Sequence, residues 1–521
     1  MPDVIKAGLP RDSGTETFGF GLDYPMDNQS SQATPRALWR HIIGYSMGHG
    51  ALALTLNGIY TYAMLYYTQA RGLPFAQAGV AFSVASLWDA VFDPALGHIS
   101  DNTRTRWGRR HPFILGGGLL MAAAFYAVWA VPDFVLRGGY LVPYFIFINI
   151  LYRTAFAIFS IPFVALGFEI CTDYLQRSQL QGTGMVVSML TSVLGPGLAW
   201  MIFFPDHARG GREATSVASN FIHMGTVFAI ASVGFTVVVI LATRRYMGNG
   251  CGVAAAPRSS LAAIYRNSGR IIANRYLRPV IIFFCVGLTG QIFVSMVQGY
   301  LFVYFMHLTA FEKTILTGGG MILCGVGAIV AAPLARRFDK KHTVCIGAAI
   351  SSLSCLTAAI LFLGGVLEPG TTWIAGGHVV PIAVIVYGAC SVLYLFGSGI
   401  YQSTAWSMVA DVAEANELRS GIRQDGGHAA VFAFSYKMVI STGTLLASAC
   451  LAWVGFVNGR DQQTPQALHG LLFLGFGLGS LFAFLVIPIV WRYPITREFM
   501  AKVKGDLALK ARLRVEEAGL P

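Results

Sequence analysis

The feature that most constrains the fold is a long series of apolar segments separated by short polar connections. A helix needs about 20 mostly apolar residues to cross the hydrocarbon core of a bilayer. Only 12% of the residues are charged, whereas soluble domains carry about 25%. The chain is therefore predicted to be an all-α integral membrane protein.

Twelve segments reach the required length, and a polar stretch divides them into two sets of six. The N-terminal half is predicted at 38–243 and the C-terminal half at 279–492, with a middle loop at 244–278 and tails at 1–37 and 493–521. The expected spans are 38–68, 75–100, 112–132, 141–170, 181–204, 217–242, 279–307, 313–335, 343–365, 376–401, 428–456 and 467–491.

Basic residues gather in alternate connections, which predicts the orientation of the chain. Cytoplasmic connections of membrane proteins are enriched in Lys and Arg, so both termini and the middle loop are expected in the cytoplasm. This distribution explains the net charge of +12 without a nucleic-acid partner. Residues 1–35 contain no apolar signal-peptide core. Abundant Arg, Ala and Gly suggest a GC-rich bacterial gene, and hence the bacterial inner membrane.

The two halves carry matching acidic residues after corresponding spans. Asp101 and Asp339 follow the second and eighth spans, and Asp173 and Asp411 follow the fourth and tenth, with the same sequence separation in both pairs. Two related six-helix halves are typical of transporters, in which the binding site lies at the midplane between them.

Four ionisable residues lie inside apolar spans, where charge is costly and normally functional. Asp89 and Asp93 are four residues apart and share one helix face. They could bind a coupling cation, or they could be structural acids paired to Lys437 or Arg153. Lys437 could pair with these acids across the two halves, or extend to the membrane surface. Arg153 could bind an anionic group of a substrate or brace its helix.

The segment that contains both acids, WDAVFDPALGHISDNTRTRWGRRHP (88–112), resembles the hallmark of the glycoside–pentoside–hexuronide:cation symporters. These form a branch of the major facilitator superfamily. Similar matches are SIPF at 160–163, AD at 410–411 with GIR at 421–423, and Lys437 in the eleventh span. The resemblance implies a major facilitator fold, and uptake of a solute driven by Na⁺, H⁺ or Li⁺.

Residue by residue, the resemblance makes Asp93 the chief Na⁺ ligand and places Asp89 in the same site. Hard cations such as Na⁺ prefer oxygen ligands, and the same carboxylate can instead take a proton. Ser160 is expected at the cation site because sugar-carrying members have there an aspartate that helps bind sugar and cation. No cofactor beyond the coupling ion is expected.

The predicted substrate site comprises Asp89, Asn57, Tyr60, Arg153, Gln298 and Lys437. The expected substrate is a small molecule, with a sugar favoured, and the expected surroundings are membrane lipid around a monomer. Three charged groups of the sugar-carrying members are absent, at positions near Ala53, Ser160 and Met185. A lysolipid carrier and a non-transporting sensor on the same fold therefore stay open as alternatives.

Charged residues in the predicted cytoplasmic connections could close an inner gate through ion pairs, or could serve only to fix topology. They are Asp101, Arg109, Arg110, Asp173, Arg177, Asp339, Asp411 and Arg423. An enzyme is not expected, because no phosphate-binding glycine loop, nucleophile elbow or metal-ligand cluster is visible in the sequence.

Overall fold

The computed structural model describes the chain from residue 35 to 517 with several gaps. Those gaps are 104, 106, 171–173, 206–213, 248–270, 272–273, 376–377, 421–424 and 458–462. The predicted gate residues Asp173 and Arg423, and nearly all of the predicted N-terminal tail, lie outside the described residues.

The N-terminal part of the chain forms a group of helices with two five-residue π-helical turns (η1 and η2) in the series. The elements are α1 (Pro35–Leu65), η1 (Tyr66–Ala70), α2 (Phe75–Asn102), α3 (His111–Trp129), α4 (Asp133–Arg137), α5 (Leu141–Ile170), α6 (Tyr174–Ser192), η2 (Val193–Gly197), α7 (Leu198–Phe203), η3 (Ala214–Ser216), α8 (Ala218–Thr243) and η4 (Arg244–Tyr246).

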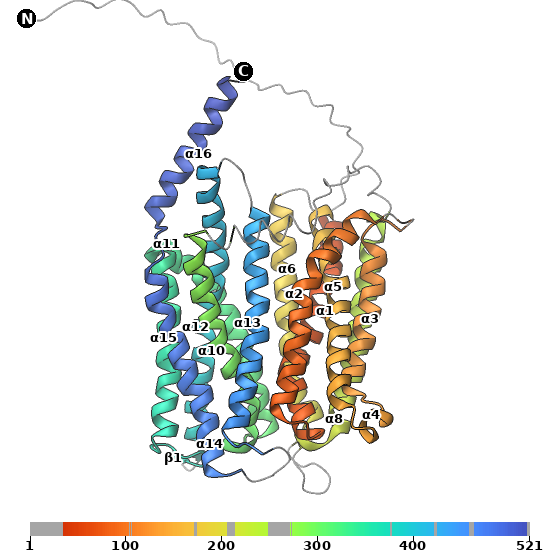
Figure 1. Ribbon diagram of the computed structural model, residues 1–521, viewed down its shortest axis with the longest axis vertical. Coiled ribbons are helices and arrows are strands. Elements are labelled where there is room, and N and C mark those ends of the chain that lie inside the picture. The colour runs from red at the N-terminus through yellow and green to blue at the C-terminus, as the bar shows by residue number, and fades with distance from the viewer. Residues whose placement is uncertain are drawn as a thin grey trace, which may run out of the picture.

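The C-terminal part is likewise a group of helices with two five-residue π-helical turns (η6 and η7), and it ends in a helix that projects from the bundle (Figure 1). Its elements are α10 (Leu277–Tyr300), η6 (Leu301–Phe305), α11 (Ala310–Leu363), β1 (Trp373–Ala375), β2 (His378–Val380), α12 (Ile382–Ser420), α13 (Asp425–Trp453), α14 (Pro465–Leu472), η7 (Phe473–Gly477), α15 (Leu478–Trp491) and α16 (Arg497–Glu517).

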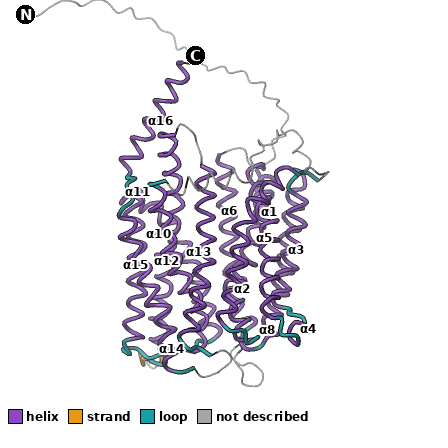
Figure 2. The backbone as a smooth tube through the Cα atoms, viewed as in Figure 1, coloured by secondary structure: helices purple, strands orange, loops and turns teal. Residues whose placement is uncertain are grey.

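Figure 1 shows the helices of the two parts side by side, with α10, α11, α12, α13 and α15 on one side and α1, α2, α3, α5 and α8 on the other. Figure 2 shows that nearly all of the described backbone is helical. Besides the loops, the described residues include a short antiparallel hairpin of β1 and β2, in which Trp373 pairs with Val380. The predicted all-α membrane fold is confirmed.

Ten described helices are long and apolar enough to cross a membrane, so the count of twelve stays a prediction. Helix α1 is not among the ten, although its 31 residues make it about 46 Å long. Its cavity-facing residues Asn57, Tyr60 and Thr61 are polar and lower its hydropathy.

The predicted connection between residues 335 and 343 is helical in the structure. Helix α11 runs through it for 54 residues, broken only at Asp339, where φ is 73° and ψ is 154°. A straight helix of that length would span about 81 Å, far more than a bilayer core of about 30 Å. The bend at Asp339 is thus the place where two spans meet.

One contact region between the two helix groups involves η1 in the N-terminal half and η6 in the C-terminal half. The Thr68 hydroxyl and the Tyr300 hydroxyl are 2.8 Å apart, and Tyr304 donates a hydrogen bond of 2.6 Å to Gln69. The ring of Phe75 packs edge-on against Tyr300, with centroids 5.3 Å apart. These contacts join η1 and the start of α2 to the end of α10 and to η6.

Helices α2 and α13 form the other main seam between the halves. The Ser83 hydroxyl donates to the Ser441 carbonyl at 2.7 Å, and the Ser441 hydroxyl donates back to the Ser83 carbonyl at 2.8 Å. One turn away, Gly79 lies so close to Ser448 that a Cβ atom on Gly79 would be 2.3 Å from the Ser448 Cβ. Small residues allow this approach, as at other helix interfaces in membranes.

Candidate functional site

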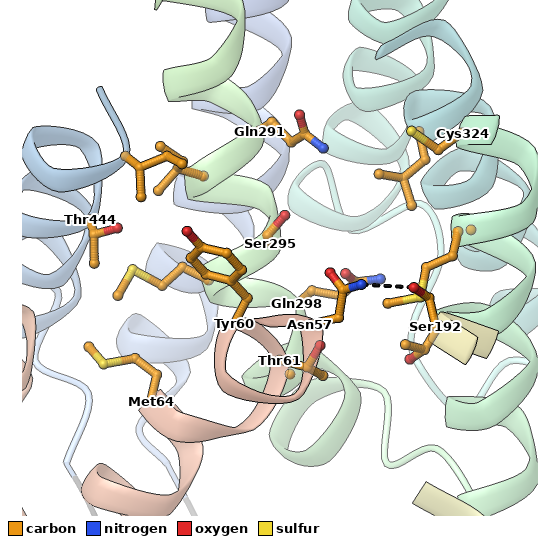
Figure 3. Close-up of a pocket in the computed structure, with 18 of the residues that line it drawn as sticks. Asn57, Tyr60, Thr61, Met64, Ser192, Gln291, Ser295, Gln298, Cys324 and Thr444 are labelled. Atoms are coloured by element: carbon orange, nitrogen blue, oxygen red, sulfur yellow. Dashed lines mark hydrogen bonds between the residues drawn. The ribbon is translucent and has the colours of Figure 1, made fainter. Parts of the chain in front are cut away.

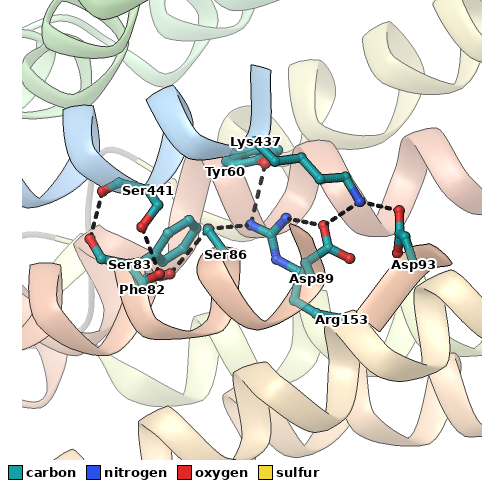
Figure 4. A network of polar contacts seen from close by, with 9 residues as sticks. All are labelled: Tyr60, Phe82, Ser83, Ser86, Asp89, Asp93, Arg153, Lys437 and Ser441. Atoms are coloured by element: carbon teal, nitrogen blue, oxygen red, sulfur yellow. Dashed lines mark hydrogen bonds and ion pairs between the residues drawn. The ribbon is translucent and has the colours of Figure 1, made fainter. Parts of the chain in front are cut away.

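Four charged side chains from three helices meet at the seam between the halves (Figure 4). Lys437 on α13 forms ion pairs with both acids of α2: its Nζ lies 3.0 Å from Asp89 Oδ2 and donates a hydrogen bond to Asp93 Oδ2. Arg153 on α5 approaches Asp89 from the other side, with 3.6 Å between Nη1 and Oδ2. The pairing of Lys437 across the halves, one of two alternatives left open by the sequence, is present in the structure.

The geometry follows from the helical spacing of the acids. Residues four apart on a helix point to the same side, so one lysine amine reaches both Asp89 and Asp93. Two positive and two negative groups make the network electrically neutral, which is the form in which buried charge is tolerated. Asp89 and Arg153 are almost completely buried, with 6% and 5% of their surfaces exposed.

One carboxylate oxygen in this network has no partner. Asp93 Oδ1 is buried and accepts no hydrogen bond from any residue that the structure describes, whereas its Oδ2 accepts one from Lys437. A buried acceptor without a partner is costly. A cation or a proton placed on this oxygen would remove that cost.

A cavity of about 430 Å³ lies between the two halves, lined by residues of α1, α2, α6, α10, α11, α12 and α13. Four carboxamides line it: Asn57, Gln291, Gln298 and Gln402. Asn57 donates a hydrogen bond of 2.8 Å to the Ser192 hydroxyl (Figure 3). Gln402 donates to the side-chain oxygen of Gln291. The volume lies within the range of small-molecule sites, about 300 to 1,000 Å³.

Tyr60 belongs to both the cavity and the charged network. Its side chain lines the cavity, and its hydroxyl accepts a hydrogen bond of 3.2 Å from Arg153. The Arg153 guanidinium also lies 5.3 Å from the centre of the Tyr60 ring and 5.7 Å from that of Phe82, which is another cavity residue. The cavity wall therefore contacts Arg153, which is itself an ion-pair partner of Asp89.

The structure divides the predicted substrate residues into two groups. Asn57, Tyr60 and Gln298 line the cavity. Asp89, Arg153 and Lys437 instead form the adjacent network. Arg153 also donates from Nη2 to the Ser86 hydroxyl at 3.3 Å, whereas its buried Nε has no hydrogen-bond partner among the described residues.

Ser160, expected at the cation site, is not part of the network. It lies on α5, seven residues after Arg153, and is only partly buried. Sequence reasoning did not assign Gln291, Gln402 and Ser192 to the site, although all three line the cavity. A polar residue within an apolar span is the sequence signal that they share.

Two of the predicted gate residues, Asp339 and Asp411, contact residues of the C-terminal half. Lys340 Nζ lies 2.6 Å from Asp411 Oδ2, and both residues belong to the C-terminal half. Asp339 accepts from the backbone of Lys340 at 2.6 Å and of Arg497 at 3.1 Å.

In the N-terminal half, Arg110 donates to the Ser100 hydroxyl at 3.2 Å, and Arg109 is partly buried. The side chains of Asp101 and Arg177 lie outside the described part of the structure. An ion pair between the halves at this end stays a prediction.

Comparison with known proteins identifies the family. Residues 44–497 match the family described as "MFS/sugar transport protein". The chain belongs to this family. Its expected membership of the glycoside–pentoside–hexuronide:cation symporters is confirmed by its similarity to curated symporters of that branch. It is a membrane transporter and not an enzyme.

Two curated relatives match nearly the whole chain. The glucuronide carrier protein homolog of Escherichia coli (strain K12) is 24% identical over 88% of this chain and 93% of its own length. The isoprimeverose transporter of Lactiplantibacillus pentosus is also 24% identical, with the same coverage of 88% and 93%. Among solved structures, a D-xylose-proton symporter superposes with a TM-score of 0.59 and 13% identity, covering 88% of this chain and 98% of the other. This last likeness concerns the fold.

Proposed function

We propose that this transporter imports a sugar or glycoside together with Na⁺ or H⁺. The observation that carries the proposal is the neutral network of Asp89, Asp93, Arg153 and Lys437, in which one oxygen of Asp93 has no partner among the described residues. The names of the two curated relatives, which refer to a glucuronide and to isoprimeverose, support a sugar as cargo.

Competition for Asp93 is the proposed origin of coupling. Lys437 and an incoming cation are both attracted by the same carboxylate, and a cation on Asp93 weakens its bond to Lys437. Because Asp93 lies on α2 and Lys437 on α13, this bond joins the two halves. Loading the cation therefore changes the free energy of the α2–α13 contact, which alternating access must break and remake.

The cavity wall would transmit the presence of the substrate to the same network. A sugar hydroxyl bound beside Tyr60 can compete for the hydrogen bond that Tyr60 accepts from Arg153. Arg153 would then be held more strongly by Asp89, which leaves Lys437 freer to exchange with a cation. Substrate and cation would in this way favour each other's binding, as symport requires.

The arrangement of contacts suggests the state that the structure represents. We propose that the upper end of Figure 1, from which α16 projects, faces the cytoplasm of a bacterium and that the lower end faces outward. The bonds of Thr68 with Tyr300 and of Gln69 with Tyr304 close the outward end. At the cytoplasmic end, the described ion pair of Lys340 and Asp411 lies within one half, as expected for an inward-facing state.

The test is uptake by purified protein in sealed liposomes. A panel of radiolabelled monosaccharides, disaccharides, aryl glycosides and a lysolipid is offered under an inward Na⁺ gradient, under an inward proton gradient, and without a gradient. Sugar accumulation that requires one of the gradients supports the proposal. Accumulation of the lysolipid alone, or sugar equilibration that no gradient alters, would contradict it.

A further inference from the structure

A cationic surface lies where the bend of α11 meets the end of α15. Two chain segments form it, residues 336–342 and 491–498, and together they contain six Lys or Arg residues and two acidic residues. The segments touch through the ring of Trp491. The Lys341 ammonium lies 4.5 Å from the centre of this ring, and His342 packs edge-on against it. Basic groups from both segments are therefore gathered in one place.

The start of α16 holds the two segments together. Arg497 donates from Nη1 to the carbonyl of Arg336 at 3.2 Å, and from its backbone N–H to Asp339 at 3.1 Å. The other carboxylate oxygen of Asp339 accepts a hydrogen bond from the backbone of Lys340 at 2.6 Å. The acid at the centre of the cationic surface is thus bonded to backbone N–H groups.

Most cations of this surface have no acidic partner. Lys340 is paired, since its ammonium lies 2.6 Å from Asp411. No ion pair joins the remaining five to any residue in the described part of the chain, and four of these five are exposed. The five are Arg336, Arg337, Lys341, Arg492 and Arg497, of which Lys341 is partly buried. The surface therefore carries positive charge that an anionic ligand could neutralise.

An apolar stripe on α15 leads to the cationic surface. Leu481, Phe484, Leu485 and Trp491 are between 37% and 58% exposed, and their spacing places them on one face of the helix. The candidate membrane span that contains them ends at Trp491. In a membrane such a stripe contacts acyl chains, and a Trp at the end of a span lies at the level of the lipid headgroups.

We propose that the cationic surface binds the headgroup of an anionic phospholipid of the phosphatidylglycerol type. The lipid phosphate is bound by the arginines and Lys341 through charge-assisted hydrogen bonds, and the acyl chains lie along the α15 stripe. Basic clusters beside membrane spans attract anionic lipids. A diacyl lipid fits better than free phosphate, because the stripe offers an apolar contact next to the charges. None of these residues lines the transport cavity, so the inference does not depend on the cargo.

The first test compares ligands that differ in headgroup. Purified full-length protein, stripped of lipid in detergent, is titrated with dioleoyl-phosphatidylglycerol, with dioleoyl-phosphatidylcholine and with inorganic phosphate, and its unfolding temperature is followed. We expect a saturable rise with phosphatidylglycerol that the other two do not reproduce. An equal rise with phosphatidylcholine, or no rise with phosphatidylglycerol, would overturn the proposal. An equal rise with inorganic phosphate would overturn the assignment to a lipid.

Substitutions test whether this surface is the site. Each basic residue near an anionic lipid contributes about fivefold in affinity, so Arg337→Gln with Arg492→Gln should raise the half-saturating phosphatidylglycerol concentration about 25-fold. The control is Arg244→Gln with Arg278→Gln, which removes two exposed arginines at the ends of α8 and α10 and should change it little. Unfolding without lipid shows whether both proteins fold. Equal weakening in the two double variants would overturn the site.

Fluorescence gives an independent measurement of the lipid's position. Phosphatidylglycerol brominated on its acyl chains quenches a Trp that it contacts. We expect part of the saturable quenching to disappear in Trp491→Phe and to remain in Trp453→Phe, where the replaced Trp is 88% exposed at the end of α13. Saturable quenching that is unchanged in Trp491→Phe would place the lipid elsewhere and contradict the proposal.

Discussion

Replacing Lys437 by glutamine should tighten cation binding while damaging coupled transport. In the structure the Lys437 amine holds both acids, at 3.0 Å from Asp89 Oδ2 and in a hydrogen bond with Asp93. The Lys437→Gln change would remove the positive charge that competes with the cation. Asp89 would keep its ion pair with Arg153 at 3.6 Å. Asp93 would therefore be the carboxylate most affected by the loss of the lysine's positive charge.

The size of the effect follows from Coulomb's law with a discount for solvent. Two unit charges 3.0 Å apart, the separation of Lys437 Nζ and Asp89 Oδ2, attract by an upper limit of about 5.5 kcal/mol at an effective dielectric constant of about 20, and the same order applies to the hydrogen-bonded pair of Lys437 and Asp93. The side chains of Lys437 and Asp93 are 23% and 30% exposed, so water screens part of this attraction and solvates the freed groups. A net change of about 1.4 kcal/mol corresponds to a tenfold gain in cation affinity.

The assay is a titration of purified protein with Na⁺, Li⁺ and protons, followed by the shift in unfolding temperature. We expect the Lys437→Gln titration to be half-saturated at about one tenth of the cation concentration that the unaltered protein needs. Uptake should fall, because the link between α2 and α13 no longer depends on the cation. Lys340→Gln is the matched control, since Lys340 also pairs with an aspartate, Asp411, at 2.6 Å. Unchanged or weaker cation affinity in Lys437→Gln, or an equal gain in Lys340→Gln, would refute this reasoning.

Two further substitutions test the cavity wall and the seam. Tyr60→Phe keeps the ring but removes the hydroxyl that accepts a hydrogen bond from Arg153 at 3.2 Å. Hydrogen bonds to charged groups contribute about 1.5 to 3 kcal/mol. We therefore expect the factor by which the cation raises substrate affinity to fall about tenfold. Full stimulation would contradict the role of Tyr60. Gly79→Ala would place a Cβ atom 2.3 Å from the Ser448 Cβ and should destabilise the closed seam by about 1 to 3 kcal/mol, seen as a lower unfolding temperature and slower uptake. Gly116→Ala, where no atom lies within 4 Å of the added Cβ, is the control, and equal effects of the two changes would argue against a seam.

Much of the fold could be predicted because each span is a local pattern. Apolar length marks α3, α5 and α8 closely, and the predicted 112–132, 141–170 and 217–242 differ from the observed bounds by only a few residues. The predicted spans 313–335 and 343–365 correspond to the two arms of α11, which meet at the non-helical Asp339. The sequence did not show that the rest of the basic connection at 336–342 would be helical.

The site was predictable where it depends on charge in an apolar segment. Asp89, Asp93 and Lys437 are conspicuous for that reason, and the structure joins them. Contacts between distant helices that involve an uncharged side chain carry no such signal. The bond of Asn57 to Ser192, that of Gln402 to Gln291, and the contact of Arg153 with Tyr60 depend on how helices pack, which periodicity does not reveal.

The central claim is that the carboxylate of Asp93 carries the coupling ion. It is tested most directly by measuring substrate affinity of purified protein with and without the coupling cation, for the unaltered chain and for Asp93→Asn. Asparagine keeps the shape and removes the charge. We predict that the cation raises substrate affinity in the unaltered protein and has no effect in Asp93→Asn, while Asp411→Asn, at the distant pair with Lys340, retains the response. A cation response that survives in a folded Asp93→Asn protein would contradict the account.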